Sequence, residues 1–432
     1  MGLRTSAGPH PHRRWGMRSS RGWQERAVEI RGRKSESGDK MKALVVGASG
    51  QIGAMTVKDL VDHYKADVVA ADLNLAGVKN VAKSTNPNKV TPVRLDVSDE
   101  KALSNALKGA DVVLNSAWYE LNMTIMTAAI KAGVHYTDLG GFYDGTLKQL
   151  KLNKKAKDAG ITCVLGIGST PGVTNVCGAA GANRLDSVDA ISIYCTWGTK
   201  KKSTEAAMPA YSIRTVIDEM TQEPGIVDKG KKMKVPIMSG ETSVVMPEPA
   251  GKVVAYYIKH SEPATMADYI GKGTKHVSFR IGFPEVDFAT FKTLAELGFG
   301  SEKMLDVGGC KCSPKDYITA MYTDAISSAR HSDEVVDEFD YLRTDVTGKK
   351  DGLPAMCTLY VRTWNDRKTG LSSGRDTSVP PSITADWLAK GKIKKTGVLP
   401  PEACLDPEPF FKELGKRKIL VDQELQVSSK FY

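Results

Sequence analysis

Three glycines stand where a strand meets a helix, in an arrangement that could hold a phosphate. Gly47, Gly50 and Gly53 follow the apolar run 43–46, and Asp72 closes the next apolar run about twenty residues further on. A strand, a glycine-rich turn, a helix and a second strand that ends in an acid are typical of a dinucleotide-binding βαβ unit. Gly47 allows the tight turn, Gly50 lets backbone N–H groups approach a pyrophosphate, and Gly53 lets the helix pack closely. The start of that helix then offers its positive end to the phosphates.

The alternative interpretation of these glycines is a turn without a ligand, because the G-x-x-G-x-x-G spacing departs from the stricter G-x-G-x-x-G. We favour the dinucleotide, since strand, helix and acid all lie where its recognition needs them. Asp72 would accept hydrogen bonds from the adenosine ribose 2′-hydroxyl and would repel a 2′-phosphate. The sequence therefore predicts NAD as the cofactor, ahead of NADP.

Strands and helices alternate from Met41 to about Gly168, which predicts a parallel sheet with helices wound on both faces. The expected strands are 43–46, 67–71, 90–95, 111–115, 134–138 and 161–165. The expected helices are 51–64, 121–132 and 147–159, and a further helix is expected to be capped by Ser98 and to end at Gly109. Ligands of such sheets bind beyond the carboxyl ends of the strands, so four turns are expected to line a site: 96–97, 115–118, 138–141 and 168–172.

The alternation weakens after about Thr174. Strand patterns at 188–197, 277–281 and 357–364 are separated by longer polar stretches, which indicates a second, α+β domain with a largely antiparallel sheet. Two short helices are expected after it. The first starts at Thr377 or Ser378, with Pro380 and Pro381 near its beginning and Gly391 at its end, and the second lies between Asp406 and Gly415.

The composition is that of an ordinary globular protein, with 41% hydrophobic and 25% charged residues among 432. No apolar run approaches the roughly 18 residues that a membrane span needs, so no membrane association is expected. The seven cysteines are scattered, and the close pair Cys310 and Cys312 lacks a second pair or nearby histidines. We therefore expect no metal site, and free thiols in a reducing cytoplasm.

Most of the net charge of +10 lies in residues 1–40, which hold ten Lys or Arg and four Asp or Glu. This segment could be a nucleic-acid arm, a transit peptide, or an extension upstream of a true start at Met41. We favour the extension and expect it to be disordered, because the segment has no hydrophobic periodicity and only two aromatic residues. No nucleic-acid partner is therefore expected.

Outside the glycine turn, three places carry residues suited to chemistry. His260 precedes Ser261 and Glu262, and a histidine beside a carboxylate could act as a general base or form a surface hydrogen-bonded pair. Arg280 interrupts an apolar strand, so it would face solvent or bind an anion such as a substrate carboxylate. The segment 170–175 is expected to form a hinge and a helix cap, and it could also contact the substrate. Glu205, Tyr211 and Arg214 are expected on a solvated helix face.

Four further segments give the chain a resemblance to the saccharopine dehydrogenase family, over about residues 41–419. They are G-V-H-Y-T-D-L-G at 133–140, P-G-V-T-N at 171–175, R-I-G-F-P-E at 280–285, and G-V-L-P-P-E at 397–402 followed by F-F-K-E-L at 410–414. The chain is similar to the branch that includes glutamate-forming saccharopine dehydrogenase, lysine 6-dehydrogenase and carboxynorspermidine dehydrogenase.

The resemblance implies a domain order and a set of contacts. After a disordered extension (1–40), an NAD(P)-binding Rossmann domain (41–173) precedes an α+β domain for substrate and dimerisation (174–370), and residues 371–420 pack back on the Rossmann domain. Substrate would lie near Asp138, Thr170, His260, Glu262 and Arg280, with His260 or Asp138 as the catalytic base. The cofactor would contact Gly47, Ser49, Gly50, Gln51, Ile52, Asp72, Asp96, Val97, Ser116 and Ala117.

The expected activity is therefore an NAD(P)-dependent oxidation of a C–N bond in a lysine-derived amino acid, such as saccharopine to glutamate and allysine. Lysine 6-dehydrogenase and carboxynorspermidine dehydrogenase activities are alternatives within the family, and a homodimer is expected. An alternative of another class is an NAD-binding sensor or assembly protein without catalysis, because fold does not fix function.

Overall fold

A computed structural model describes residues 40–199, 212–283, 285–329, 337–365 and 372–429. The expected extension lies outside these residues except for Lys40, and so do Glu205 and Tyr211. No helix among the described residues is both long enough and apolar enough to cross a bilayer.

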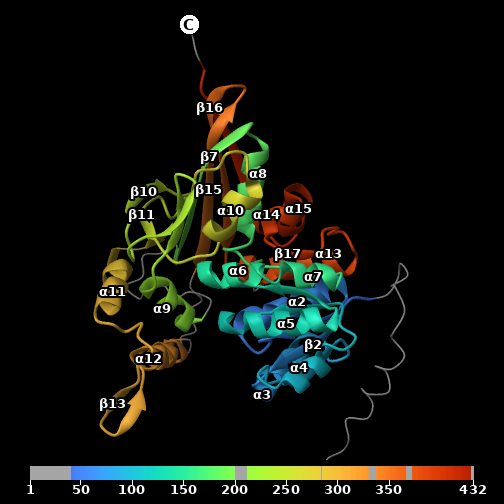
Figure 1. Ribbon diagram of the computed structural model, residues 1–432. Coiled ribbons are helices and arrows are strands. Elements are labelled where there is room, and N and C mark those ends of the chain that lie inside the picture. Colours follow the sequence, from blue (N-terminus) through green and yellow to red (C-terminus); the bar gives the residue numbers. More distant parts are fainter. Residues whose placement is uncertain (1–39, 200–211, 284, 330–336, 366–371, 430–432) are drawn as a thin grey trace, which may run out of the picture. The chain divides into compact units, whose positions relative to one another are not determined.

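The first domain is built on a parallel seven-stranded sheet in the order β17–β6–β5–β4–β1–β2–β3 (Figure 1). Its strands are β1 (Lys42–Val46), β2 (Asp67–Asp72), β3 (Val90–Arg94), β4 (Val112–Asn115), β5 (His135–Asp138), β6 (Thr162–Val164) and β17 (Gly397–Leu399). The strand order reverses at β1 and β4, which places a topological switch point directly beside the glycine turn. The parallel, doubly wound sheet predicted from the sequence is confirmed.

Both faces of this sheet are buried, which explains its apolar strands. Ala43 and Val45 of β1 face a core shared with α2 (Gln51–Tyr64), α3 (Leu75–Thr85) and α13 (Arg375–Ala389). Leu44 and Val46 face the opposite core, which includes α4 (Glu100–Ala106) and α5 (Asn122–Ala132). Alternate side chains of one strand therefore bind two helical layers together.

Three helices differ from their predicted form. The helix expected from Ser98 is capped by Asp99 instead, whose carboxylate accepts from the backbone N–H groups of Lys101 and Ala102. The helix expected at 147–159 is two shorter ones, α6 (Phe142–Leu150) and α7 (Asn153–Asp158). Helix α13 starts at Arg375, so Pro380 and Pro381 lie inside it. Proline is favoured at a helix start because it lacks a donor, but here burial of nearly every residue of α13 keeps the helix continuous.

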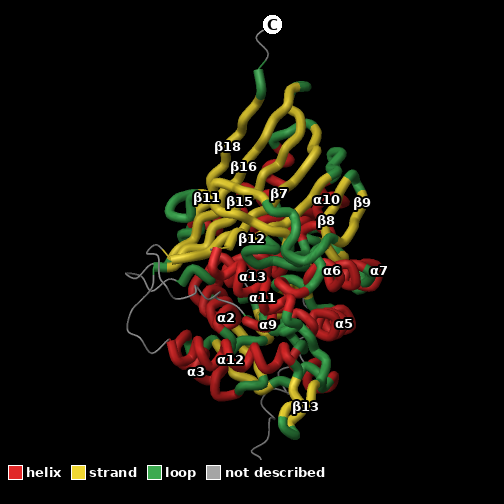
Figure 2. The backbone as a smooth tube through the Cα atoms, turned by 90° about the vertical axis from the view of Figure 1, so that its left-hand side faces the viewer, coloured by secondary structure: helices red, strands yellow, loops and turns green. Residues whose placement is uncertain are grey.

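The second domain is a mixed nine-stranded sheet with the main order β10–β11–β12–β7–β15–β16–β18 (Figure 2). The main strands are β7 (Ser187–Thr199), β10 (Thr242–Val245), β11 (Lys252–Tyr257), β12 (His276–Phe283), β15 (Glu338–Lys350), β16 (Leu353–Trp364) and β18 (Leu420–Val427). Strands β8 (Gly225–Asp228) and β9 (Lys231–Lys234) extend it beside β12. Only the β7–β12 pair is parallel among the described pairs, so the sheet is largely antiparallel as expected.

Helices link the two sheets and extend the second domain. Helix α8 (Val173–Asn183) packs on β15, and α10 (Glu262–Ile270) packs on β12. A smaller group consists of α9 (Ile213–Thr221), α11 (Glu285–Glu296) and α12 (Pro314–Ala329), with the hairpin β13 (Leu305–Val307) and β14 (Cys310–Cys312). The final helices are α14 (Pro401–Cys404) and α15 (Pro407–Gly415), the latter capped by Asp406 as predicted.

Candidate active site

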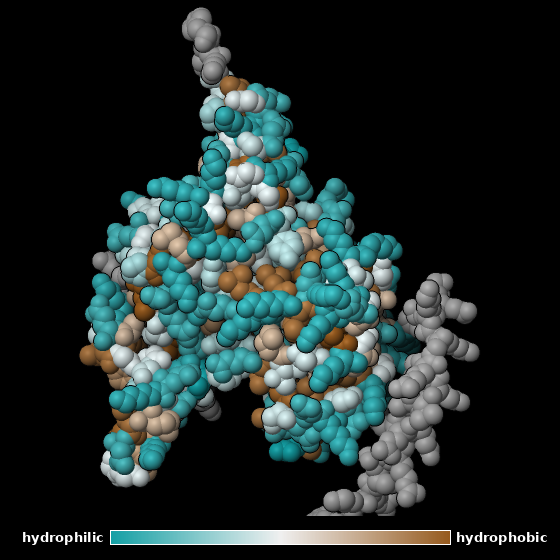
Figure 3. Space-filling view, viewed as in Figure 1, coloured by the Kyte–Doolittle hydropathy of each residue, from teal (hydrophilic) through white to brown (hydrophobic). Residues whose placement is uncertain are grey.

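A cavity of about 590 Å³ lies at the carboxyl ends of the first sheet, between it and the second domain. Gly50, Ser116 and Thr170 contribute to its wall from the first half of the chain, and His260 and Asp340 from the second domain. Figure 3 shows a hollow in the surface between the nucleotide-binding part and the part that carries α12 and β13, and Thr319 of α12 also lines the cavity. The turns after β4 and β6 reach this cavity, as the sequence predicted.

The glycine turn has the close contacts that only glycine allows. A Cβ on Gly53 would lie 2.2 Å from the carbonyl oxygen of Gly47, so the first turn of α2 packs against the loop itself. Gly50 has room for a Cβ, lines the cavity, and begins α2 without a side-chain cap. The helix start is therefore open to a ligand phosphate, which fits a nucleotide.

Asp72 lies at the end of β2 and is held toward the glycine turn. Its carboxylate accepts hydrogen bonds from the backbone N–H groups of Ser49 (3.1 Å) and Asn74 (3.0 Å). The next two residues, Leu73 and Asn74, are exposed and uncharged. An acid in this place, with no basic residue directly after it, suits a ribose with a free 2′-hydroxyl.

The loop after β4 offers polar groups that lack partners. Asn115 holds the loop, because its Oδ1 accepts from the N–H of Ala117 (3.0 Å) and its Nδ2 donates to Asn122 (2.7 Å). The hydroxyl of Ser116 and the indole N–H of Trp118 are buried without a hydrogen-bond partner. Buried polar groups are nearly always paired, so these atoms fit a bound ligand.

Of the other expected cofactor residues, Gln51 and Ile52 line the cavity, whereas Asp96 and Val97 lie in the turn after β3 and do not.

His260, Glu262 and Thr170 come together as one network. His260 Nδ1 lies 2.5 Å from Glu262 Oε2, and the hydroxyls of Thr170 and Thr174 donate to Glu262 Oε1 at 2.5 and 2.9 Å. The His260 ring stacks on Phe279 of β12, with 3.8 Å between ring centroids. No hydrogen bond among the described residues engages Nε2 of His260, which leaves that nitrogen available in a residue that lines the cavity. The alternative of a surface pair is wrong, because His260 and Glu262 are both buried.

The ionisation of this pair follows from burial and charge. Burial alone would lower the pKa of His260, but the charge and hydrogen bond of Glu262, together with the charge of Glu219, raise it overall. Burial alone would raise the pKa of Glu262, but His260 and the hydroxyl of Thr170 lower it overall. The pair is therefore an imidazole whose protonated form is stabilised by a fixed carboxylate.

Asp138 has a structural position rather than a catalytic one. Its Oδ2 accepts from Tyr136 and Gln149, and its Oδ1 accepts from the backbone N–H groups of Gly140 and Gly166, all within 2.9 Å. The residue is 1% exposed and does not line the cavity. Four donors leave no oxygen free to accept a substrate proton, so we do not retain Asp138 as a base.

Arg280 lies on the wrong face of the second sheet for the role predicted from the sequence. Its neighbours Phe279 and Ile281 face the cavity side, so strand alternation turns Arg280 to the opposite face. There its guanidinium donates to the carbonyl of Gly240, to Ser278 and to Tyr257. These contacts engage the guanidinium on the face away from the cavity, and we do not retain Arg280 as a substrate ligand.

Arg214, expected on a solvated helix face, lines the cavity instead. Its guanidinium lies over the Trp118 ring, 4.7 Å from the centroid, and pairs with Asp316 and Glu302 of the α12 region. Its Nε is buried without a hydrogen-bond partner. Arg214 therefore supplies a cationic donor that the sequence pattern did not reveal. The apolar spacing of α9 marks the buried face of the helix, but it does not show which surface Arg214 meets.

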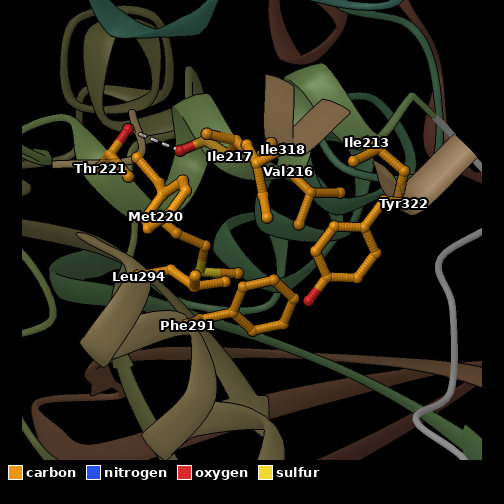
Figure 4. Close-up of a pocket in the computed structure, with 10 residues that line it drawn as sticks. Ile213, Val216, Ile217, Met220, Thr221, Phe291, Leu294, Ile318 and Tyr322 are labelled. Carbon is orange, nitrogen blue, oxygen red and sulfur yellow. Dashed lines mark hydrogen bonds between the residues drawn. The ribbon is translucent and has the colours of Figure 1, made fainter. Parts of the chain in front are cut away.

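Helix α9, which carries Arg214, is fixed by apolar packing and by one buried ion pair. Figure 4 shows side chains of α9, α11 and α12, among them Ile217, Phe291 and Ile318, around a void of about 20 Å³, too small for a substrate. Lys315 of α12 lies 2.5 Å from Asp218, which also accepts from the hydroxyl of Tyr119. The helix is thus attached to the loop that follows β4.

A group of carboxyl side chains that sequence analysis missed forms another part of the cavity wall. Glu219 of α9, Asp340 of β15 and Asp376 of α13 all line the cavity. They come from three elements far apart in the chain, and no local pattern in the sequence brings them together.

Comparison with known proteins agrees with this architecture. The saccharopine dehydrogenase NADP binding domain matches residues 43–164, and the saccharopine dehydrogenase C-terminal domain matches residues 168–420. The chain belongs to the saccharopine dehydrogenase family. The resemblance drawn from the motifs is confirmed, and the protein is an NAD(P)-dependent dehydrogenase with a nucleotide-binding domain.

Several known proteins are similar to this chain along most of their length. It is 25% identical to carboxyaminopropylagmatine dehydrogenase of Synechocystis over 87% of this chain and 95% of the relative. It is 24% identical to carboxynorspermidine synthase of Vibrio cholerae over 84% of this chain and 94% of the relative. The solved structure of glutamate-forming saccharopine dehydrogenase from Saccharomyces cerevisiae has the same fold, with a TM-score of 0.70 and 16% identity, covering 89% of this chain and 100% of that one.

Proposed function

We propose that this saccharopine dehydrogenase family member oxidises, with NAD, the C–N bond of a secondary amine that carries a carboxyl group. The observation that supports the proposal most strongly is the buried His260–Glu262 pair, which lies in the same cavity as the open start of α2. A base and a nucleotide site must share one cavity if hydride is to leave the carbon next to the amine nitrogen.

The reaction balances as follows: a secondary amine, NAD⁺ and water give a carbonyl compound, a primary amine, NADH and a proton. NAD⁺ supplies the hydride acceptor at C4 of its nicotinamide. Hydride leaves readily only from the neutral amine, so Nε2 of His260 takes the proton from the ammonium form. Glu262 stabilises the imidazolium that results, and Thr170 and Thr174 hold Glu262 in place.

Two further donors in the cavity wall suit the carboxyl group of the substrate. Arg214 Nε and the indole N–H of Trp118 are both buried without partners and belong to residues that line the cavity. A guanidinium and a neutral donor together bind a carboxylate well. Two relatives are named carboxyaminopropylagmatine dehydrogenase and carboxynorspermidine synthase, and both names contain a carboxylated amine. This supports a carboxyalkyl amine ahead of free lysine as the substrate.

The proposed function is tested by incubating the full chain with NAD and a panel of saccharopine, lysine and carboxylated polyamines. Reduced nicotinamide and a carbonyl product in equal amounts are expected for at least one carboxyalkyl amine. Binding of NAD without turnover of any of these amines would favour the sensor interpretation instead. A homodimer and a cytoplasmic location also stay predictions of this proposal.

Replacing Asp72 by alanine is expected to change the choice of cofactor. The loss of a charged acceptor for the ribose hydroxyl should raise the KM for NAD by about 10- to 100-fold. The KM for NADP should change little or fall, because a repulsion is removed. Steady-state kinetics with both cofactors measure the ratio, with Asp67→Ala at the other end of β2 as the control. An unchanged ratio would remove Asp72 from cofactor selection.

Replacing Glu262 by glutamine is expected to shift the pH profile of the reaction. Glu262 raises the pKa of His260, so the variant should hold a less basic imidazole. The base acts in its neutral form, and the acidic limb of kcat/KM should therefore move to lower pH. An acidic limb that stays at the wild-type pH would contradict the role of this pair, and Glu241→Gln, an exposed acid on another loop, serves as the control.

A further inference from the structure

We infer that Asp340 and Asp376 form a subsite for a protonated amino group on the substrate, distant from the C–N bond that reacts. This inference rests on the proposed function and deepens it, because it assigns the substrate a cationic tail. It uses none of the residues proposed for catalysis.

The two carboxyl groups reach the cavity from different elements. Asp340 lies on β15 opposite Trp197 of β7, so both side chains share one face of the sheet with Cys195, two residues from Trp197. Asp376 lies in the first turn of α13 and is 1% exposed. All four residues named here line the same cavity.

Several carboxyl groups lie near one thiol in this region. Burial, together with the charges of Asp340, Asp376, Glu219 and Glu262, raises the pKa of Cys195. Of these four, Glu262 is paired with His260. Neither Asp340 nor Asp376 forms an ion pair with any residue that the structure describes.

The nearest arginine on the chain is engaged elsewhere. Arg375 precedes Asp376, but its guanidinium donates to the backbone carbonyls of Arg417, Trp364, Ser372 and Lys418. Its charge lowers the pKa of Asp376 only in part. The cation that would neutralise the two aspartates is therefore expected to arrive with the substrate.

A buried oxygen without a partner marks the place of that cation. Oδ1 of Asp376 accepts from the hydroxyl of Thr377 at 3.2 Å, whereas Oδ2 is buried with no hydrogen-bond partner. The hydroxyl of Ser169, close enough to lower the pKa of Asp376, does not reach hydrogen-bond geometry and is itself buried without a partner. An ammonium carries three donors and can serve both aspartates at once.

A metal ion is a poorer candidate for the same place. Among the described residues no group of three or more His, Cys, Asp or Glu side chains has the arrangement of a metal site. Asp376 is also almost inaccessible to water, which a hydrated divalent cation would need to retain in part. An organic ammonium on an alkyl chain suits the neighbouring Trp197 and Ile281, which line the cavity beside them.

The subsite is coupled to a proton. Burial, with the charge of Asp376, raises the pKa of Asp340, and burial raises the pKa of Asp376 to about 7. Two such acids without a cation hold a proton between them near neutral pH. Arrival of an ammonium should release that proton, so binding of the cation should tighten as the pH rises through about 7.

Isothermal titration calorimetry with putrescine, 1-butanol and glutarate tests the subsite. Putrescine carries ammonium groups, 1-butanol has an alkyl chain of the same length without a charge, and glutarate carries the opposite charge. The wild-type chain should bind putrescine at least about tenfold more tightly than 1-butanol, and glutarate least. Titration in two buffers of different ionisation enthalpy should show proton release with putrescine alone.

The variants Asp340→Asn and Asp376→Asn should each remove most of the preference for putrescine and the proton release. Asp386→Asn is the matched control, since Asp386 lies on the same helix α13 but pairs with Lys390. A preference that survives in both cavity variants, or that is absent from the wild type, would overturn the inference. Circular dichroism of each variant checks that it is folded.

Failure of the subsite and failure of the proposed function give different results. Turnover of carboxyalkyl amines without any effect of Asp340→Asn or Asp376→Asn on cation preference would reject only the subsite. Diamine binding that depends on both aspartates, without oxidation of any amine, would reject only the oxidoreductase assignment.

Discussion

The variant His260→Gln should oxidise a carboxyalkyl amine with kcat/KM about 10²- to 10⁴-fold below that of the wild type. Glutamine can still donate a hydrogen bond, but it cannot take a proton from the substrate ammonium. His260 lies in the cavity wall with Nδ1 paired to Glu262, so Nε2 is the nitrogen placed to act. Steady-state rates of nicotinamide reduction measure the effect.

The matched control for this variant is His276→Gln. His276 lies on β12, near half exposed, and pairs with Asp228 outside the cavity. It should retain wild-type activity. At high pH, where the substrate amine is already neutral, His260→Gln should recover part of its rate. Equal activity of the two variants at neutral pH would exclude His260 as the base.

The variant Asp376→Asn should be more stable than the wild type at pH values above about 7. Burial raises the pKa of Asp376 to about 7 from an ordinary value of 3.8. The folded state therefore binds a proton that the unfolded state has lost, and wild-type stability should fall as the pH rises from about 4 to about 7. An asparagine avoids the buried charge, and the gain at high pH should be about 1–4 kcal/mol in the free energy of unfolding.

Urea denaturation at several pH values measures this effect. The wild type should lose stability toward high pH, and the variant should show a weaker dependence over the same range. At low pH, where the wild-type carboxyl is neutral in both states, the two proteins should differ little. A variant that is less stable than the wild type at high pH would show that Asp376 is ionised and satisfied within the protein.

The nucleotide-binding half could be predicted because its signals are local. Strands such as β1 and β4 are largely apolar and buried on both faces. Helix ends are marked by single residues, such as Gly133 with its left-handed backbone and Asp406 with its side-chain cap. The glycine turn and Asp72 follow the chain order of one βαβ unit. The position of Ser116 at the cavity could also be predicted, because this residue directly follows strand β4 and ligands bind beyond the carboxyl ends of such strands.

The substrate side of the cavity depends on tertiary structure and could be predicted only in part. His260 and Glu262 are neighbours in sequence, and their pairing follows. Whether Arg280 faces the cavity depends on which face of β12 the first domain covers, and an apolar pattern on both sides of the strand does not decide that. Asp340 and Asp376 come together only because the first residues of β15 and of α13 line the same cavity.

Transfer of deuterium to the nicotinamide would show that hydride leaves the carbon next to the amine nitrogen. Carboxyalkyl amines with deuterium at the carbons that flank the amine nitrogen are incubated with the full chain and NAD. Mass spectrometry of the reduced cofactor should find the label, together with an equal amount of carbonyl product, and His260→Gln should suppress both. Nucleotide that binds but stays oxidised with every carboxylated amine, or reduced cofactor without label, would contradict hydride transfer from the C–N carbon.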